Sequence, residues 1–292
     1  MLFKNPLLLI SITTCVFCIH ALHFSSLIDF NRFANGPFAD VKSGFKPRII
    51  EPYLPKRHSL PFIAFITIRA PTYQRDCTGS IIAPRYILTS LDCLVAAAAH
   101  LKVKVQLLLK FVTVRTGTVY KTVGGTTSPV IDFFTTNNTN AGIVEDIVIL
   151  ELSRNVTHSE TAEPITLGRW QPKVGANLTI AGQTRIVNRR DVPVNHYVIG
   201  KATVSKLPPC HGTNYAFCVR DRDQGATPGD EGGPAYKTVN GEYVQVGMIR
   251  SGEWKETADN HVLNEGKYLL IAPFCNFIKV TTRGEAHCKT IH

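Results

Sequence analysis

From residue 61 onward, short apolar runs alternate with polar breaks along the chain, which is the pattern of a β protein. The runs are rich in β-branched and aromatic residues, and most are too short for a helix. Only 95–100 and the segment near Cys275 are expected to be helical. Many short strands separated by turns predict a barrel or a sandwich. The predicted strands lie in 62–69, 80–83, 86–90, 101–123, 146–152, 177–182, 197–207, 242–252 and 267–274.

The strongest local signal is a hairpin around Asn240-Gly241. These two residues separate YKTV from EYVQVG, two runs in which apolar and polar residues alternate. A two-residue hairpin turn needs a positive φ at both central residues, and Asn followed by Gly meets this need readily. We therefore predict two antiparallel strands that are joined at 240–241.

The first 22 residues have the layout of a secretory signal peptide. Lys4 precedes an apolar run over 6–19, and small residues follow near Ala21. A membrane anchor is the competing interpretation, but the run is shorter than the roughly 20 residues that a span needs, and no basic cluster follows it. We expect cleavage near Ala21 and a secreted, extracellular protein.

Residues 23–48 differ from the rest because they contain no cysteine and show little periodicity. They end at Arg48, which precedes Ile49-Ile50. The segment is either a loosely structured N-terminal extension or a propeptide that is removed by cleavage after Arg48. The sequence thus divides into 1–22, 23–48 and a main domain over 49–292.

The cysteines and the N-x-T sites agree with a secreted chain. Removal of 1–22 takes away Cys15 and Cys18 and leaves an even number of cysteines, which predicts disulfides. The count alone leaves their connectivity open. The remaining cysteines are Cys77, Cys93, Cys210, Cys218, Cys275 and Cys288, and the predicted glycosylation sites are Asn137, Asn155 and Asn177.

The formal net charge is +10, and the Lys and Arg residues are scattered along the chain instead of forming one block. Such a balance favours acidic partners such as sulfated glycans, and it is equally typical of an ordinary solvated basic surface. The sequence contains no nucleic-acid-binding motif and no later run long enough to cross a membrane. No metal and no cofactor are expected.

Three blocks in a fixed order carry the candidate chemistry. CTGSIIAPRYILTSLDC spans 77–93, EDIVILEL spans 145–152, and TPGDEGGPAY spans 227–236. Together they resemble the signature blocks of the trypsin/chymotrypsin-like serine peptidase family, which read T-A-A-H-C, D-I-A-L-L and G-D-S-G-G-P. The resemblance covers roughly 49–280. It implies an all-β fold of two six-stranded antiparallel β-barrels with a short C-terminal helix.

The positions that match the family's catalytic triad depart from its pattern. The resemblance assigns Asp92 to the place of the general-base histidine and Glu231 to that of the nucleophilic serine, and it keeps the acid as Asp146. Glutamate has no hydroxyl that could form an acyl-enzyme, and no serine lies between Ser205 and Ser251. We interpret the chain as a non-catalytic serine protease homologue and not as an enzyme.

Other parts of the family's site have counterparts. The resemblance implies an oxyanion hole made by the backbone of Gly229 and Glu231, and a specificity-pocket base at Gly225 and Ala226. Gly225 stands where trypsin has an aspartate, so a basic side chain would find no partner there. The implied activation step is a cleavage after Arg48 that pairs the new terminus at Ile49 with Asp230.

The resemblance also implies a disulfide pattern. It pairs Cys77 with Cys93 and Cys210 with Cys218. This leaves Cys275 with Cys288, a pair that is atypical of the family. Thr227 stands where the family usually has a cysteine, so the disulfide beside the specificity pocket is missing.

Several functions are open at this point. We expect the three carboxylates at the triad positions to converge, and Arg250 to form a salt-bridge cluster with Asp146 and with Asp92. Calcium binding by these carboxylates is the alternative. The resemblance implies an extracellular protein partner, namely a protease, its substrate or its inhibitor, with a role as decoy, cofactor or competitor. The alternatives are altered, carboxylate-based chemistry such as glycoside cleavage, and a basic surface that binds sulfated glycans. GDEGG also fits the nucleophile elbow of α/β-hydrolases, but Pro234 and a hairpin follow it where that fold needs a helix.

Overall fold

The computed structural model describes residues 60–136, 145–183, 185–188, 190–193, 195–207, 215–259 and 261–291. All of them belong to one unit, 46–292. The predicted signal peptide and extension, with Arg48 and Ile49, lie outside the described residues, as do Cys210 and Asn137. The boundaries at 22 and 48 therefore stay predictions.

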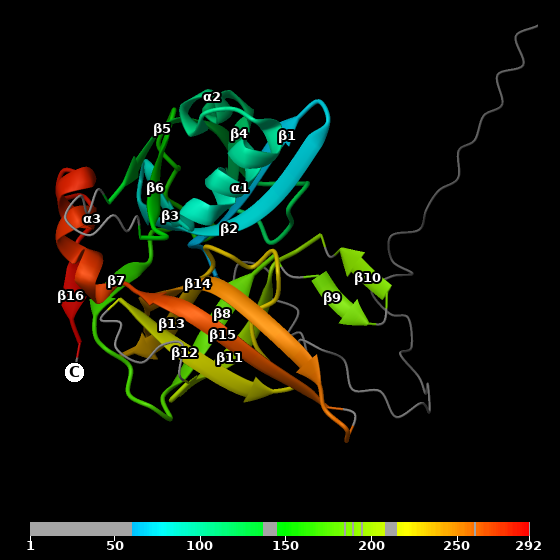
Figure 1. Ribbon diagram of the computed structural model, residues 1–292. Helices are drawn as coiled ribbons and strands as arrows, with labels where there is room; N and C mark the ends of the chain where they lie inside the picture. Colours follow the sequence, from blue (N-terminus) through cyan, green and yellow to red (C-terminus); the bar gives the residue numbers. More distant parts are fainter. Residues whose placement is uncertain are drawn as a thin grey trace, which may run out of the picture. The chain divides into compact units, whose positions relative to one another are not determined.

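Six antiparallel strands close the first barrel in the order β1-β2-β3-β6-β5-β4 (Figure 1). Alternate residues of β1, such as Ile66 and Ile68, are fully buried inside it, as strand geometry requires. Val112 and Val114 of β4 fill the same interior. The strands are β1 (Ile63–Ala70), β2 (Tyr73–Ala83), β3 (Tyr86–Thr89), β4 (Val112–Thr116), β5 (Thr126–Thr135) and β6 (Val148–Leu152).

The second sheet has eight strands, six of which form a ring. β13, β8, β11, β12, β15 and β14 pair in that order, and an antiparallel pairing of β14 with β13 closes the ring. The expected fold of two six-stranded antiparallel barrels is confirmed, with parallel β14–β7 and β7–β16 pairings added at its edge. The strands are β7 (Thr166–Arg169), β8 (Asn177–Gly182), β11 (Val198–Ser205), β12 (Ala216–Arg222), β13 (Pro234–Val239), β14 (Glu242–Glu256), β15 (Val262–Leu270) and β16 (Cys288–Thr290), and β9 (Arg185–Asn188) pairs with β10 (Arg190–Pro193) alone.

Apolar side chains form three cores, one inside each barrel and one that joins them. In the joining core, Phe62 of the first barrel lies edge-on to Tyr236 of β13, with ring centroids 5.4 Å apart. A buried polar contact crosses the same junction, where Ser80 Oγ donates to Gln245 Oε1 at 2.7 Å. The two barrels are therefore packed against each other by both apolar and polar contacts.

The predicted hairpin is confirmed. β13 and β14 are joined at Asn240, with φ 51°, and Gly241, with φ 83°, and Val239 pairs with Glu242 on either side. Positive φ at both central residues is what the Asn-Gly pair predicts.

The helices of the described residues are α1 (Leu91–Leu101) and α3 (Cys275–Thr281), as expected, and three further short ones. The prediction of strand throughout 101–123 is wrong, because α2 (Val105–Leu108) and the 3₁₀ helix η2 (Leu109–Phe111) precede β4. Val105, Leu108 and Leu109 pack onto the first core at the i, i+3 and i+4 spacing of a helix, whereas Leu107 is exposed. A second 3₁₀ helix, η4 (Ala272–Phe274), leads into α3. No helix in the described part of the chain is long and apolar enough to span a membrane.

Candidate functional site

Asp146 lies just before β6 and accepts hydrogen bonds from the start of α1. Its Oδ1 receives the Ser90 hydroxyl at 2.7 Å and the Asp92 backbone N–H at 2.8 Å. Ser90 is the N-cap residue of α1, but its side chain makes no cap bond within the helix. The first turn of a helix has backbone N–H groups without partners inside the helix. Asp146 therefore supplies, from the segment before β6, the acceptor that a capping side chain would normally provide.

The second oxygen of Asp146 faces Arg250 of β14. Arg250 Nε lies 3.7 Å from Asp146 Oδ2, an ion pair that is too long for a hydrogen bond. Asp146 is buried, at 6% exposed. Burial raises the pKa of its carboxyl, and the Asp92 N–H, the Ser90 hydroxyl and the charge of Arg250 oppose that rise. The expected pair of Arg250 with Asp146 is thus present in the structure.

The side chain of Asp92 points away from this buried pair. It is 60% exposed, and its Oδ2 lies 3.4 Å from a guanidinium nitrogen of Arg75 on β2. Asp92 contributes its backbone to Asp146 and its carboxylate to a surface ion pair with Arg75. The expected pairing of Arg250 with Asp92 is not found among the ion pairs of the described residues. The two carboxylates are neighbours, but only one of them is buried.

Glu231 lies in the turn between β12 and β13, and this turn packs closely on the first barrel. Gly232 has φ 84°, and a Cβ atom there would lie 2.1 Å from Thr89 Oγ1 and 2.3 Å from the Thr78 carbonyl oxygen. Only glycine fits such an approach. The Thr78 N–H donates to the Glu231 carbonyl at 3.2 Å, which holds the turn to β2.

The carboxylate of Glu231 folds back onto its own turn. Its Oε2 accepts the backbone N–H of Gly229 at 2.7 Å. Gly229 has φ 107°, a conformation that turns this N–H toward the Glu231 side chain. The half-buried carboxylate is therefore satisfied locally, by a donor two residues away.

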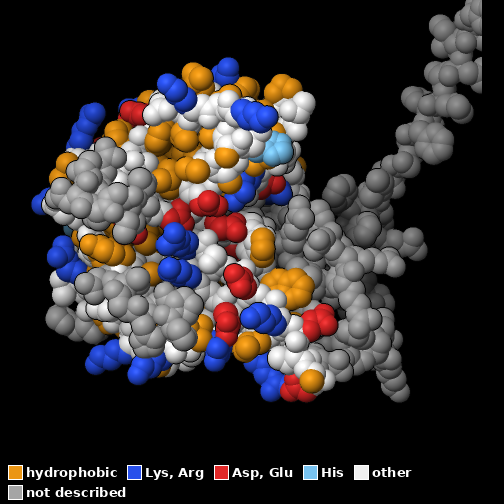
Figure 2. Space-filling view, in the orientation of Figure 1, with side chains coloured by type: hydrophobic (Ala, Val, Ile, Leu, Met, Phe, Trp, Pro, Cys, Tyr) orange, Lys and Arg blue, Asp and Glu red, His pale blue; other side chains and the backbone are white. Residues whose placement is uncertain are grey.

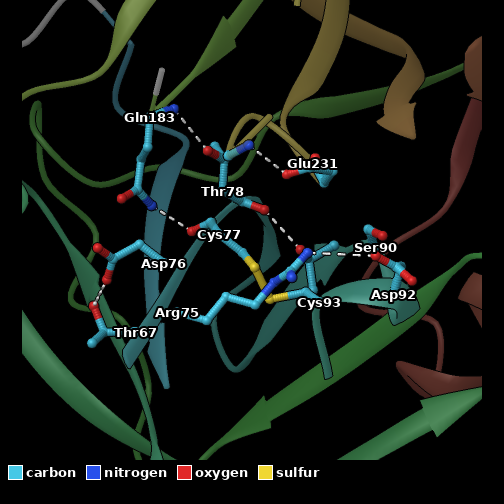
Figure 3. The surroundings of a disulfide bond; sticks show 12 residues. Thr67, Arg75, Asp76, Cys77, Thr78, Ser90, Asp92, Cys93, Gln183 and Glu231 are labelled. Carbon is cyan, nitrogen blue, oxygen red and sulfur yellow. Dashed lines mark hydrogen bonds and ion pairs between the residues drawn. A yellow bond between two sulfur atoms is a disulfide. The ribbon is translucent and has the colours of Figure 1, made fainter. Parts of the chain in front are cut away.

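The three carboxylate positions meet along the junction of the two barrels. Figure 3 shows Thr78, Glu231, Ser90 and Asp92 grouped around the Cys77–Cys93 disulfide. Figure 2 shows acidic and basic side chains side by side in the middle of this face. Each carboxylate has its own nearby donor or cation, so the expected convergence is one of position and not of direct contact.

Comparison with known proteins identifies the fold family. Residues 49–278 match the family model described as Trypsin. The chain belongs to the trypsin family. It is 25% identical over 216 residues to trypsin alpha of Drosophila melanogaster, covering 65% of this chain and 80% of that protein. It is 27% identical over 194 residues to chymotrypsin-2 of Vespa crabro (64% and 81% covered) and 26% identical over 192 residues to human cathepsin G (61% and 69% covered).

The predicted base of the specificity pocket in this trypsin-family chain lies against Asn264 of β15. Gly225 has φ 131°, and a Cβ atom there would lie 1.9 Å from Asn264 Oδ1. Asn264 is 3% exposed, and its Nδ2 donates to the Ala226 carbonyl at 2.8 Å. Gly252 of β14 approaches the same carbonyl, where a Cβ would lie 2.0 Å away. The carboxamide of Asn264 therefore takes up the space beside Gly225.

Asp230 is buried at 2% exposed and accepts hydrogen bonds from Thr227. The Thr227 N–H donates to Asp230 Oδ2 at 2.8 Å, and the Thr227 hydroxyl donates to the same oxygen at 3.2 Å. The predicted partner of Asp230, the terminus at Ile49, lies outside the described residues. The activation step thus stays a prediction.

Two of the three predicted disulfides are formed between described residues, Cys77–Cys93 and Cys275–Cys288. Cys218 is also disulfide-bonded, with a partner outside the described residues. The predicted glycosylation sites Asn155 and Asn177 are exposed, and their glycosylation stays a prediction.

Sequence reasoning missed the side chains that complete this site. Three contacts join residues that are distant in the sequence: Arg75 with Asp92, Ser90 with Asp146, and Asn264 with Ala226. No motif marks them, although Ser90 stands between the matched threonine and Asp92 in TSLDC. Within the described residues, no group of three or more His, Cys, Asp or Glu is placed to hold a metal ion.

Proposed function

We propose that the chain is a secreted, non-catalytic member of the trypsin family that acts by binding an extracellular protein. One observation carries this proposal: Glu231 Oε2 accepts the Gly229 N–H at 2.7 Å. By the family resemblance, this N–H is one of the donors that stabilise the oxyanion of a reacting carbonyl. A carboxylate that already occupies the donor excludes the substrate oxygen and repels the negative charge that would develop there.

The chemistry of the other two positions supports the same proposal. Glu231 has no hydroxyl for an acyl-enzyme, and Asp92 cannot relay a proton near neutral pH as an imidazole does. Asp146, which would orient the base, uses Oδ1 on the Ser90 hydroxyl and the Asp92 backbone. The relatives are named as proteases. Activity depends on the residues of the site, whereas family membership gives the fold.

A binding role fits what the chain keeps. The two-barrel scaffold carries surface loops between its strands, and such loops provide recognition on many folds. The predicted signal peptide and the disulfides favour an extracellular setting. The proposed partner is an active protease, its substrate or its inhibitor, toward which the chain acts as a decoy, a cofactor or a competitor.

The first test combines activity with active-site labelling. The purified protein, before and after limited trypsin treatment, is assayed with a broad panel of fluorogenic peptides and a serine-reactive fluorophosphonate probe, beside active trypsin as the positive control. We expect neither turnover nor labelling of this chain. Turnover or labelling that maps to this chain would overturn the non-catalytic assignment.

Two variants at position 231 make the outcome specific. Turnover that vanishes in Glu231→Gln would point to carboxylate-based chemistry, which contradicts the proposal. Labelling that persists in Glu231→Ala comes from another hydroxyl or a contaminating protease, and mapping the labelled peptide separates the two. The binding role is tested by adding the chain to an active trypsin-family protease with its protein substrate and inhibitor. The rate at which the protease cleaves its substrate, or its inhibition, is expected to change. An unchanged rate of cleavage and unchanged inhibition would contradict the binding role.

A further inference from the structure

A basic groove lies on the outer face of the first barrel. It crosses β2, β1, β4 and β5 and has a cavity volume of about 440 Å³. Pockets that bind small ligands have volumes of about 300–1,000 Å³. The groove shares no lining residue with the site described above. On β2, the side chains of Gln74 and Asp76 line the groove, whereas Arg75 between them pairs with Asp92 of that site.

The floor of this groove is built by strand alternation. Ile66 and Ile68 of β1 point into the barrel core, so Thr67 and Arg69 point outward into the groove. Register places Thr67 opposite Thr113 on β4 and opposite Asp76 on β2. Side chains that lie opposite each other on adjacent strands share a face. Residues from four strands are thereby brought together on one surface.

The segment 117–125 forms a wall of the groove and is held in place. The Lys121 N–H donates to the Asn195 carbonyl at 2.9 Å, and the Thr122 hydroxyl donates to Asn195 Oδ1 at 2.8 Å. Arg115 donates from a guanidinium nitrogen to the Gly124 carbonyl at 2.5 Å. The groove is therefore formed before any ligand binds, which lowers the entropic cost of binding.

The charge of the groove is strongly positive. Four cationic residues and one carboxylate line it. The carboxylate, Asp76, is already paired with Lys121 Nζ at 2.8 Å and accepts the Thr67 hydroxyl at 3.1 Å. Arg69, Lys110 and Arg115 form no ion pair with any carboxylate of the described residues. Three uncompensated cations beside hydroxyl groups are a site for an anion with several negative groups.

We propose that this groove binds a segment of a sulfated glycan. Its lining is mainly threonine hydroxyls and cations, which match sugar hydroxyls and sulfate groups. An acidic peptide fits less well, because the strands belong to a closed barrel that offers no free edge for backbone pairing. Of the two aromatic residues in the lining, Phe65 is only 1% exposed and Phe111 is half-buried, with Lys110 Nζ 4.9 Å from its ring centroid, so the apolar surface of the groove is small and lies beside a cation. The proposal is independent of whether the chain is catalytic.

The test measures binding of a heparin-derived sulfated hexasaccharide to the full secreted protein. The groove variant carries Arg69→Gln, Lys110→Gln and Arg115→Gln. The control variant carries Lys173→Gln, Lys201→Gln and Lys255→Gln, three exposed lysines outside the groove, and changes the net charge equally. We expect the groove variant to lose about tenfold or more in affinity and the control less than about threefold, because charge-assisted contacts outweigh long-range attraction. Thermal unfolding verifies that both variants fold.

Other outcomes would overturn the proposal. Equal losses in both variants would mean diffuse attraction to net charge, and equal binding of the desulfated hexasaccharide would exclude sulfate recognition. Binding of a poly-glutamate peptide in the groove, with none of the hexasaccharide, would assign the site to acidic protein segments. If Arg115→Gln prevents folding, the pair Arg69→Gln and Lys110→Gln is compared with Lys173→Gln and Lys201→Gln, and equal losses again reject the proposal.

Discussion

Removing the carboxylate of Asp146 is predicted to destabilise the fold. Asp146→Ala leaves the fully buried Ser90 hydroxyl and the Asp92 N–H without their acceptor. A buried donor without a partner costs about 1–3 kcal/mol. Part of this loss is offset, because the substitution also removes a carboxylate that is unfavourably buried. We expect the free energy of unfolding to fall by about 2 kcal/mol, which lowers Tm by about 4–8 °C for a domain of this size.

The assay is thermal and urea unfolding followed by circular dichroism, with Asp146→Asn as the matched control. The asparagine Oδ1 can accept both hydrogen bonds, so the free energy of unfolding of this variant should fall by less than about 1 kcal/mol. Wild-type and Asp146→Asn proteins should also differ in pH dependence. Because burial raises the pKa of Asp146 in the folded state, its contribution to stability is greatest below the ordinary carboxyl pKa and falls as pH rises through the raised pKa. Asp146→Asn removes this pH dependence of the free energy of unfolding, because asparagine does not titrate. An alanine variant as stable as wild type, or an asparagine variant as unstable as alanine, would refute the capping role.

Two further substitutions test packing and cross-linking. Gly232→Ala should lower the free energy of unfolding by about 3 kcal/mol or more, because strain at a positive φ is added to a clash with the backbone. The new Cβ would lie 2.3 Å from the Thr78 carbonyl oxygen. Gly241→Ala, with φ 83° and no atom within 4 Å of the new Cβ, is the control, and it should lose only about 1–2 kcal/mol. Equal losses in urea unfolding would contradict the close approach of the 229–233 turn. The double variant Cys275→Ser and Cys288→Ser opens a bridge with a sequence separation of 13 and should lose about 3 kcal/mol; an unchanged urea midpoint under non-reducing conditions would show that the bridge adds no stability.

The sequence predicted most strands because their signal is local. The runs of β-branched and aromatic residues in 62–69 and 242–252 correspond to β1 and β14, and the Asn-Gly turn corresponds to the β13–β14 hairpin. The stretch 101–111 was misread because a short apolar run can be helix or strand, and only its packing on α1 decides. β5 was missed because it contains Pro129 and many polar residues. The contacts of Asn264 with Ala226 and of Arg75 with Asp92 depend on strand register across the fold, which local patterns do not determine.

The G-D-x-G-G-P block of this chain makes backbone contacts with both barrels. The Gly232 N–H donates to the Ile249 carbonyl and the Ile249 N–H to the Gly233 carbonyl, both at 2.9 Å. The Glu231 carbonyl binds the Thr78 N–H on β2, so one turn ties the first barrel to β14 of the second. All of these bonds use backbone atoms and are independent of the side chain at position 231. The G-D-x-G-G-P block can therefore hold the two barrels together whether or not it carries a nucleophile, so the block is evidence for the fold and not by itself for the activity.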